Sequence, residues 1–263
     1  MSTVTLATTY HDPRGVLYPQ LARLLPTLMG HFAAIAVDAS PELHPPTLAL
    51  LREQGIALSQ QARPLSHDGV PHLGKARRDA VRLALQQDTP FVMYCDGDRM
   101  LHWLDHYPAE LASVLDALTQ YDFTILGRTP RAFASHPRVQ SETEAIINQL
   151  YTALSGHGWD ITAAARGFSR SAAQAIVDGC HDDTLGVDAA WPLFLQTQGN
   201  FQLGYIETEG LEFETAAQQP VAVATAGGVE AWRATLDRDP QAWAFRLSVA
   251  RIEVESMLPY KSR

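Results

Sequence analysis

Cysteine is scarce in this chain. Of its 263 residues only Cys95 and Cys180 are cysteines, and they form neither a CxxC pair nor the spacing of a zinc site. This usage favours a reduced, cytoplasmic setting. The segment after Met1 has no cationic stretch followed by an apolar core, so we expect no signal peptide. No apolar run approaches the ~20 residues of a membrane span, and no transmembrane segment is expected.

Basic residues are also few: the chain has 20 Lys and Arg against 29 Asp and Glu. The formal net charge of −9 argues against a nucleic-acid-binding surface, which normally carries a basic field. The glycine fingerprint GxGxxG is missing after the first predicted strand, where residues 8–15 read TTYHDPRG. Its absence argues against a Rossmann dehydrogenase and disfavours a nucleotidyltransferase. Hydrophobic content of 46% and charge of 19% are typical of a globular protein, and the length suits a single domain over residues 1–263.

What the chain does have is an apolar strand that ends in two acids. Five apolar or aromatic residues from Phe91 to Cys95 predict a buried strand, and Asp96 and Asp98 follow, separated by Gly97. Two adjacent carboxylates are costly unless a positive group lies between them. Mg²⁺ or Mn²⁺ carrying phosphates would satisfy them. The alternative is an ordinary Asp-Gly turn, although no partner strand follows as a hairpin requires.

Strand and helix patterns alternate through the first half. Strands are predicted at 4–10, 31–38, 56–60 and 91–95, helices at 15–29, 45–54 and 75–87, and a polar loop with Pro64, Gly69, Pro71 and Gly74 before the last of these helices. Such repetition predicts an α/β fold with a mostly parallel sheet covered by helices. Ligands of such sheets bind beyond the carboxyl ends of the strands, where Tyr10, Asp38 and the acid pair all fall.

The second half is less regular. Helices are predicted at 106–120, 139–154, 170–177, 188–195 and 240–257, and strands at 123–127 and 201–206. The last helix is expected to pack on the domain rather than on a membrane, because its charges are mixed. We expect residues 1–105 and 106–263 to form the two halves of one domain.

The order of these segments resembles a known family. A strand with a Thr-Tyr loop, a strand ending Val-Asp-Ala-Ser at 37–40, a helix opened by Gly-Lys-Ala-Arg at 74–77 and a strand ending Asp-Gly-Asp at 96–98 look like the nucleotide-sugar half of GT-A fold glycosyltransferases. The likeness is to family 2 and the mannosylglycerate synthase-like enzymes. It covers residues 3–100 well and is looser from 160 to 215.

The resemblance implies roles for the residues of the first half. It places Asp38 on the nucleotide base, Thr8 and Tyr10 around the base, and Asp96 on the ribose or a metal-bound water. It gives Asp98 the Mn²⁺ or Mg²⁺ that bridges the diphosphate. Lys75 and Arg77 lie near a helix N-terminus, a position suited to phosphate. Asp38 is equally a candidate helix cap, and Lys75 and Arg77 equally candidates for solvated surface charges.

On the acceptor side the resemblance points to Arg166 and Asp188. Asp188 would bind acceptor hydroxyls or serve as the general base of an inverting reaction, and Arg166 would hold an acceptor anion. Alternatively, Asp188 is a helix N-cap and Arg166 is a surface residue. Related enzymes often supply a histidine as third metal ligand, but residues 210–215 contain none. Glu212, Glu214 and the earlier His181 are the substitutes that the sequence offers.

The resemblance therefore implies a metal-dependent enzyme. It would move a sugar from a UDP- or GDP-linked donor to the hydroxyl of a small-molecule or lipid-linked acceptor. Two alternatives stay open: a degenerate protein that binds nucleotide-sugars without turnover, and a nucleotidyltransferase of related fold. Donor sugar, acceptor, stereochemical outcome and oligomeric state are not specified by these residues.

Overall fold

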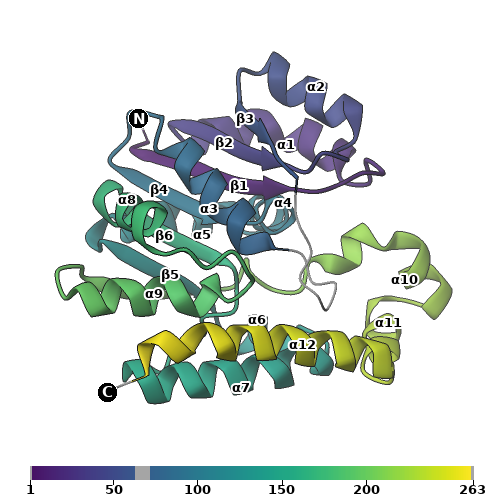
Figure 1. Ribbon diagram of the computed structural model, residues 1–263. Helices are drawn as coiled ribbons and strands as arrows, with labels where there is room; N and C mark the ends of the chain where they lie inside the picture. The colour runs from purple at the N-terminus through teal and green to yellow at the C-terminus, as the bar shows by residue number, and fades with distance from the viewer. Residues whose placement is uncertain (1, 63–71, 262–263) are drawn as a thin grey trace.

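A seven-stranded sheet forms the centre of the computed structural model, which describes residues 2–62 and 72–261 (Figure 1). Across the sheet the described strands are β3 (Ala57–Gln60), β2 (Ala34–Ala39), β1 (Val4–Tyr10), β4 (Phe91–Cys95), β6 (Ala165–Ser169), β5 (Phe123–Arg128) and β7 (Leu203–Thr208). The loop predicted around Pro64, Gly69 and Pro71 lies outside the described residues.

Of these seven strands only β6 runs against the others. It pairs antiparallel with β4 and β5, whereas β1 pairs parallel with β2 and β4, and β5 with β7. The carboxyl ends of six strands therefore point to one edge of the sheet. The register sets Thr9 beside Asp38, and Tyr10 beside Ala39, at that edge. The predicted mostly parallel α/β sheet is confirmed.

Helices cover both faces of the sheet. One apolar cluster joins the strands to α1 (Tyr18–His31), α2 (Pro45–Glu53), α4 (Gly97–His106) and α5 (Pro108–Ala117). A second cluster, on the other face, contains residues of α3 (Leu73–Ala84), α7 (Arg138–Ser155), α8 (Arg170–Gly179), α9 (Val187–Gln198) and α12 (Pro240–Met257). The long helices α7 and α12 lie side by side below the sheet (Figure 1).

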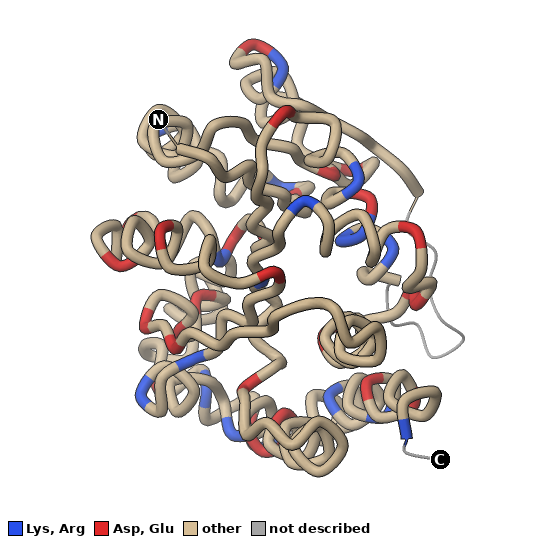
Figure 2. The backbone as a smooth tube through the Cα atoms, turned by 90° about the vertical axis from the view of Figure 1, so that its left-hand side faces the viewer, with Lys and Arg blue, Asp and Glu red and all other residues tan. Residues whose placement is uncertain are grey.

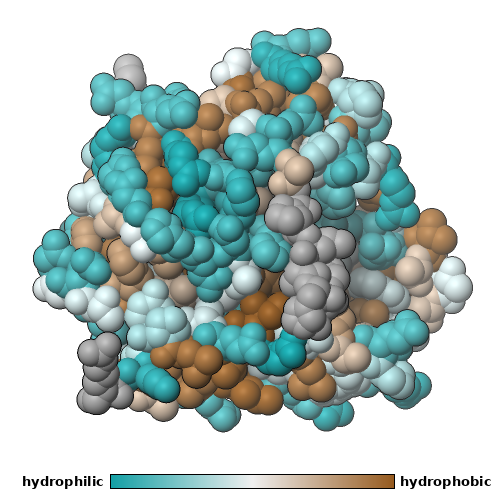
Figure 3. All heavy atoms as spheres, viewed as in Figure 1, coloured by the Kyte–Doolittle hydropathy of each residue, from teal (hydrophilic) through white to brown (hydrophobic). Residues whose placement is uncertain are grey.

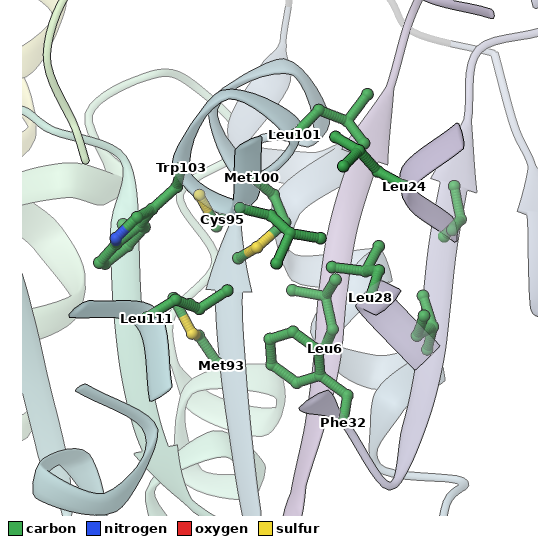
Figure 4. Close-up of a cluster of buried hydrophobic side chains, with 14 of the residues drawn as sticks. Leu6, Leu24, Leu28, Phe32, Met93, Cys95, Met100, Leu101, Trp103 and Leu111 are labelled. Atoms are coloured by element: carbon green, nitrogen blue, oxygen red, sulfur yellow. The ribbon is translucent and has the colours of Figure 1, made fainter. Parts of the chain in front are cut away.

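Alternation of side chains along β4 explains why this strand is apolar on both faces. Met93 and Cys95 point into the first cluster, where Figure 4 shows them with Leu6, Met100 and other buried side chains. Val92 and Tyr94 belong to the second cluster. A strand buried on both faces reads as a continuous hydrophobic run, and this is the pattern that predicted β4.

Several short elements were not predicted. Helix α4 begins directly after β4, where the sequence reading placed its next helix at 106–120. The antiparallel strand β6 was not predicted as a strand, although Arg166 within it was a predicted site residue. The remaining short elements are α6 (Pro130–Ala134), α10 (Pro220–Ala226), α11 (Val229–Leu236), and the 3-10 turns η1 (Leu118–Gln120), η2 (Thr215–Gln218) and η3 (Leu258–Tyr260).

Charge and hydropathy along the described chain agree with the composition. Figure 2 shows Lys and Arg interspersed with Asp and Glu over most of the chain. Among the described residues no helix combines the length and the hydropathy that crossing a membrane requires. Both cysteines are free and buried, Cys95 within the first cluster and Cys180 within the second.

Candidate functional site

The two acids lie where β4 becomes α4. Asp96 is the residue before the helix, and Asp98 lies in its first turn, so both carboxylates are at a helix N-terminus. The dipole of a helix favours negative charge there. Gly97 opens the helix, and a Cβ on it would lie 2.4 Å from Cδ2 of Tyr10. The structure requires glycine at this position because the Tyr10 ring packs against it.

Asp96 is held by three side chains from neighbouring elements. The Tyr94 hydroxyl donates to Oδ1 at 2.5 Å and the Thr9 hydroxyl at 3.2 Å, while Nη2 of Arg77 lies 3.1 Å from Oδ2. Burial opposes ionisation of Asp96, but the Arg77 guanidinium and the Tyr94 hydroxyl outweigh it and lower the pKa of the carboxyl below its usual value. Asp96 is therefore a fixed carboxylate.

Arg77 connects Asp96 to Asp188. It is buried on α3, and its Nη1 lies 3.1 Å from Oδ2 of Asp188, at the start of α9. The other Asp188 oxygen lies 3.2 Å from Nη2 of Arg166 on β6. The structure thus connects four predicted site residues by ion pairs: Asp96, Arg77, Asp188 and Arg166.

Arg166 lies too deep to be a surface residue. It is 1% exposed, and besides Asp188 it donates to the backbone carbonyls of Ala165 and Ile161. The alternative considered from the sequence, a surface charge, is wrong because the side chain is buried. The guanidinium is occupied in holding β6, the 161–165 segment and the start of α9 together.

Asp98 has different surroundings from Asp96. Its Oδ1 accepts the backbone N–H of Arg99 at 2.8 Å, and its Oδ2 accepts the side-chain amide of Gln218 at 2.5 Å. Burial, together with the nearby carboxylates of Glu214 and Asp96, raises the pKa of Asp98 to about 6. A carboxyl that is crowded by other carboxyls in this way is suited to a cation.

A cavity of about 200 Å³ opens at this edge of the sheet. Its described lining comprises Thr9, Tyr10, His11, Leu17, Leu73, Asp96, Asp98 and Gln218. The Tyr10 hydroxyl is buried and has no hydrogen-bond partner among the described residues. Burial and the nearby Asp12 and Asp98 carboxylates raise the pKa of Tyr10. Tyr10, Asp96 and Asp98, predicted separately from three positions, therefore line one cavity.

Asp38 and Lys75 lie beside a second, smaller hollow, together with His72 and Asp79. Asp38 is buried and accepts a hydrogen bond of 2.6 Å from the Ser59 hydroxyl. Lys75 contacts Asp79 at 2.5 Å, so its ammonium group is already paired. The structure places these two predicted residues together, beside a hollow that Asp98 does not line.

The two glutamates proposed as third metal ligands have different surroundings, and only Glu214 lies near Asp98. Glu212 is bound by His102, Tyr107 and Arg131 and does not line the cavity. Glu214 lies close enough to Asp98 to raise its pKa; its Oε1 is 3.7 Å from Nε of Arg99, and its buried Oε2 has no partner among the described residues.

The described part of the chain does not contain a complete metal site. Within residues 2–62 and 72–261 no group of three or more His, Cys, Asp and Glu side chains is arranged to hold a metal ion. His181 lies elsewhere, beside a cavity that η3 and the end of α12 also line. Asp98, with Glu214 and Asp96 near it, would fit a hard cation only if a bound ligand supplied further oxygens.

Sequence reasoning missed Thr9 and Gln218. Thr8 faces an apolar hollow with Leu25 and Leu28, whereas Thr9 reaches Asp96, because adjacent strand residues face opposite sides. Alternation along β1 was the signal that could have chosen Thr9. Gln218 comes from a segment 120 residues beyond Asp98, and no local pattern marks it.

By sequence, no family model and no curated protein matches the chain. Solved structures of glucosyl-3-phosphoglycerate synthase from Mycobacterium tuberculosis do resemble its fold. The complex with phosphoglyceric acid has a TM-score of 0.50 at 12% identity and covers 78% of this chain and 70% of that chain. The fold is of the GT-A glycosyltransferase type.

Other solved forms of the same synthase give similar values. The complex with Mg²⁺ and uridine-diphosphate has a TM-score of 0.49 at 12% identity and covers 78% of this chain and 69% of that chain. The complex with Mn²⁺, uridine-diphosphate-glucose and phosphoglyceric acid has a TM-score of 0.48 at 12% identity, covering 84% and 78%. At this identity the likeness concerns the fold, and residue roles have to be argued from this chain's own geometry.

Proposed function

We propose that this protein is a metal-dependent glycosyltransferase that moves a sugar from a nucleoside-diphosphate sugar to a hydroxyl acceptor. The observation that carries the proposal is the acid pair Asp96 and Asp98, which lines a cavity at the carboxyl edge of a GT-A type sheet. In open α/β sheets this edge is where ligands bind. A cavity with acids at one end and the Tyr10 ring at the other suits a cation-bound diphosphate joined to a nucleoside.

Asp98 would hold the Mn²⁺ or Mg²⁺, with Asp96 beside it. The cation, when bound, would neutralise the charge of the departing diphosphate. Among the described residues Glu214 is the further carboxylate near Asp98, and its buried, unpartnered Oε2 supports a part in the same site. With so few protein oxygens, much of the cation's coordination would come from the diphosphate and water, as is usual for Mg²⁺.

Donor binding would extend from this cavity toward β2. Tyr10 and Thr9 would contact the nucleoside, and Asp38, at the end of β2, is the candidate to bind the base, UDP- and GDP-linked donors being the classes to test. Thr8 faces the apolar hollow, which argues against direct contact with the base.

Arg77 and Asp188 would together position the Asp96 carboxylate. Arg77 holds the Asp96 carboxylate, and Asp188 holds Arg77, so the pair would fix the metal-side acid while the diphosphate leaves. Both Asp188 oxygens contact guanidinium groups, which favours a positioning role over that of a general base. Arg166 would support Asp188 from within the core.

One second function is favoured by a specific observation. A protein that binds nucleotide-sugars without turnover would need neither a free base nor a full metal site. In the described chain Asp188 is paired at both oxygens, and no three-residue metal group is formed. The two functions differ in one measurable respect, the release of nucleoside diphosphate.

The test is a panel of UDP- and GDP-sugars incubated with the full chain and Mn²⁺, with and without small hydroxylated acceptors. A glycosyltransferase releases the nucleoside diphosphate catalytically with at least one donor, and chelation of the metal stops the release. Saturable nucleotide binding with no release from any donor would support the binding protein instead. Absence of both binding and release would remove the proposed site.

A further inference from the structure

Gln218 donates a hydrogen bond to Asp98, the carboxylate that is proposed to bind the cation. Its Nε2 donates to Oδ2 of Asp98 at 2.5 Å, and the backbone N–H of Arg99 donates to Oδ1. Both oxygens of Asp98 therefore carry hydrogen-bond donors. Gln218 and Asp98 line the same cavity, so the Gln218 N–H group, which cannot coordinate a cation, competes for Oδ2 with a cation that enters from that cavity.

The segment that carries Gln218 is weakly anchored. Neither η2 nor α10 contains a buried residue, and Val221 in α10 is 78% exposed. Residues 215–229 contain no charged side chain. Figure 3 shows apolar side chains gathered at the right-hand edge of the molecule, over α10. Few buried contacts mean a low cost for local displacement.

The same segment also borders a hollow on its other side. Thr215 and Gln219 line a space of about 230 Å³ together with Phe213, Trp232 and Arg246, between α7, α11 and α12. Gln218 lines the cavity of Asp98 instead. Residues of one short stretch of chain thus line both spaces, and its displacement changes both.

We propose that Gln218 is an autoinhibitory latch on Asp98: it caps this carboxylate in the cation-free protein, and loading of a divalent cation with a nucleoside diphosphate releases it together with residues 215–227. The inference rests on the proposed cation site. It adds that a residue of the C-terminal half, Gln218, competes with the cation for Asp98. The cation replaces one hydrogen bond to a charged group, while the loosely held segment allows the amide to leave. Loading at the donor cavity is thereby linked to the hollow behind the segment.

The latch predicts that loss of the amide strengthens cation binding. Mn²⁺ is titrated into the full chain in the presence of UDP, by calorimetry, for the wild type, Gln218→Ala and the matched control Gln219→Ala. Gln218→Ala should bind Mn²⁺ roughly three- to tenfold more tightly, the size expected when a competing hydrogen bond to a charged group is removed. Gln219→Ala, whose side chain lines the other hollow, should bind as the wild type does.

Hydrogen exchange provides a readout that does not depend on the variant. In the wild type, Mn²⁺ with UDP should speed amide exchange across residues 215–227. Equal or weaker Mn²⁺ binding by Gln218→Ala, unchanged or slowed exchange in this segment, or no Mn²⁺ binding at all would each overturn the latch. Because neither measurement uses turnover, a protein that passes both and transfers no sugar retains the latch and loses only the proposed function.

Discussion

The guanidinium of Arg77 lies 3.1 Å from the Asp188 carboxylate and, through its other nitrogen, 3.1 Å from Asp96. One buried cation thus joins the end of β4 to the start of α9, and so the first half of the chain to the second. Tyr94 adds to this junction, because Arg77 also lies over its ring at 5.8 Å from the centroid. The position of Asp96 therefore depends on a residue of the second half of the chain.

Replacement of Arg77 by methionine should cost about 3 kcal/mol of unfolding free energy, because two carboxylates lose their buried counter-charge at once. Urea denaturation followed by circular dichroism measures this loss. Arg52→Met is the matched control, since Arg52 lies exposed on α2 and its loss should change stability by less than about 0.5 kcal/mol. Equal stability of the two variants would show that Arg77 is not the junction described.

Gly97→Ala should destabilise the protein by about 1–3 kcal/mol, because the added Cβ lies 2.4 Å from a ring carbon of Tyr10 in a packed site. The same change in a Tyr10→Leu background should cost less, which thermal unfolding of the four proteins measures. Gly30→Ala is the control, since its Cβ meets no atom within 4 Å. A Gly97→Ala cost that is independent of residue 10 would contradict the close packing as the cause.

The raised pKa of Asp98 predicts a pH-dependent stability. Between its ordinary pKa of 3.8 and about 6 the folded protein keeps a proton that the unfolded chain has lost, so stability falls as pH rises through this window and levels off above it. The wild type should lose about 1–2 kcal/mol relative to Asp98→Asn between pH 4 and 6.5, given about 1.4 kcal/mol per unit and partial solvent screening. Cation-free denaturation curves at both pH values measure it. A constant difference between the two proteins would contradict the raised pKa.

The strands and the acid pair were predictable from sequence because their signals are local. β1 and β4 are buried on both faces and read as apolar runs, and Asp96 and Asp98 follow β4 directly. Parallel topology then gathered Tyr10, Asp38 and the pair along one edge without any knowledge of side-chain contacts.

The partners of these acids were not predictable. Gln218 meets Asp98 across 120 residues, and Arg166 lies buried on an antiparallel strand of five residues that was not predicted. The resemblance and a place near a helix N-terminus suggested that Arg77 faces phosphate, whereas tertiary packing pairs it with two carboxylates. Roles that depend on pairing between distant elements become visible only in the folded chain.

The central claim is that Asp98 holds the cation on which sugar transfer depends. The most direct measurement is Mn²⁺-dependent release of nucleoside diphosphate by the wild type, Asp98→Ala and Asp105→Ala. Asp105 is the control because it lies on the same helix and pairs with Arg23 at the surface. Release should fall at least a hundredfold in Asp98→Ala, with the circular dichroism spectrum unchanged, and should persist in Asp105→Ala. Undiminished release by a folded Asp98→Ala protein would contradict the account.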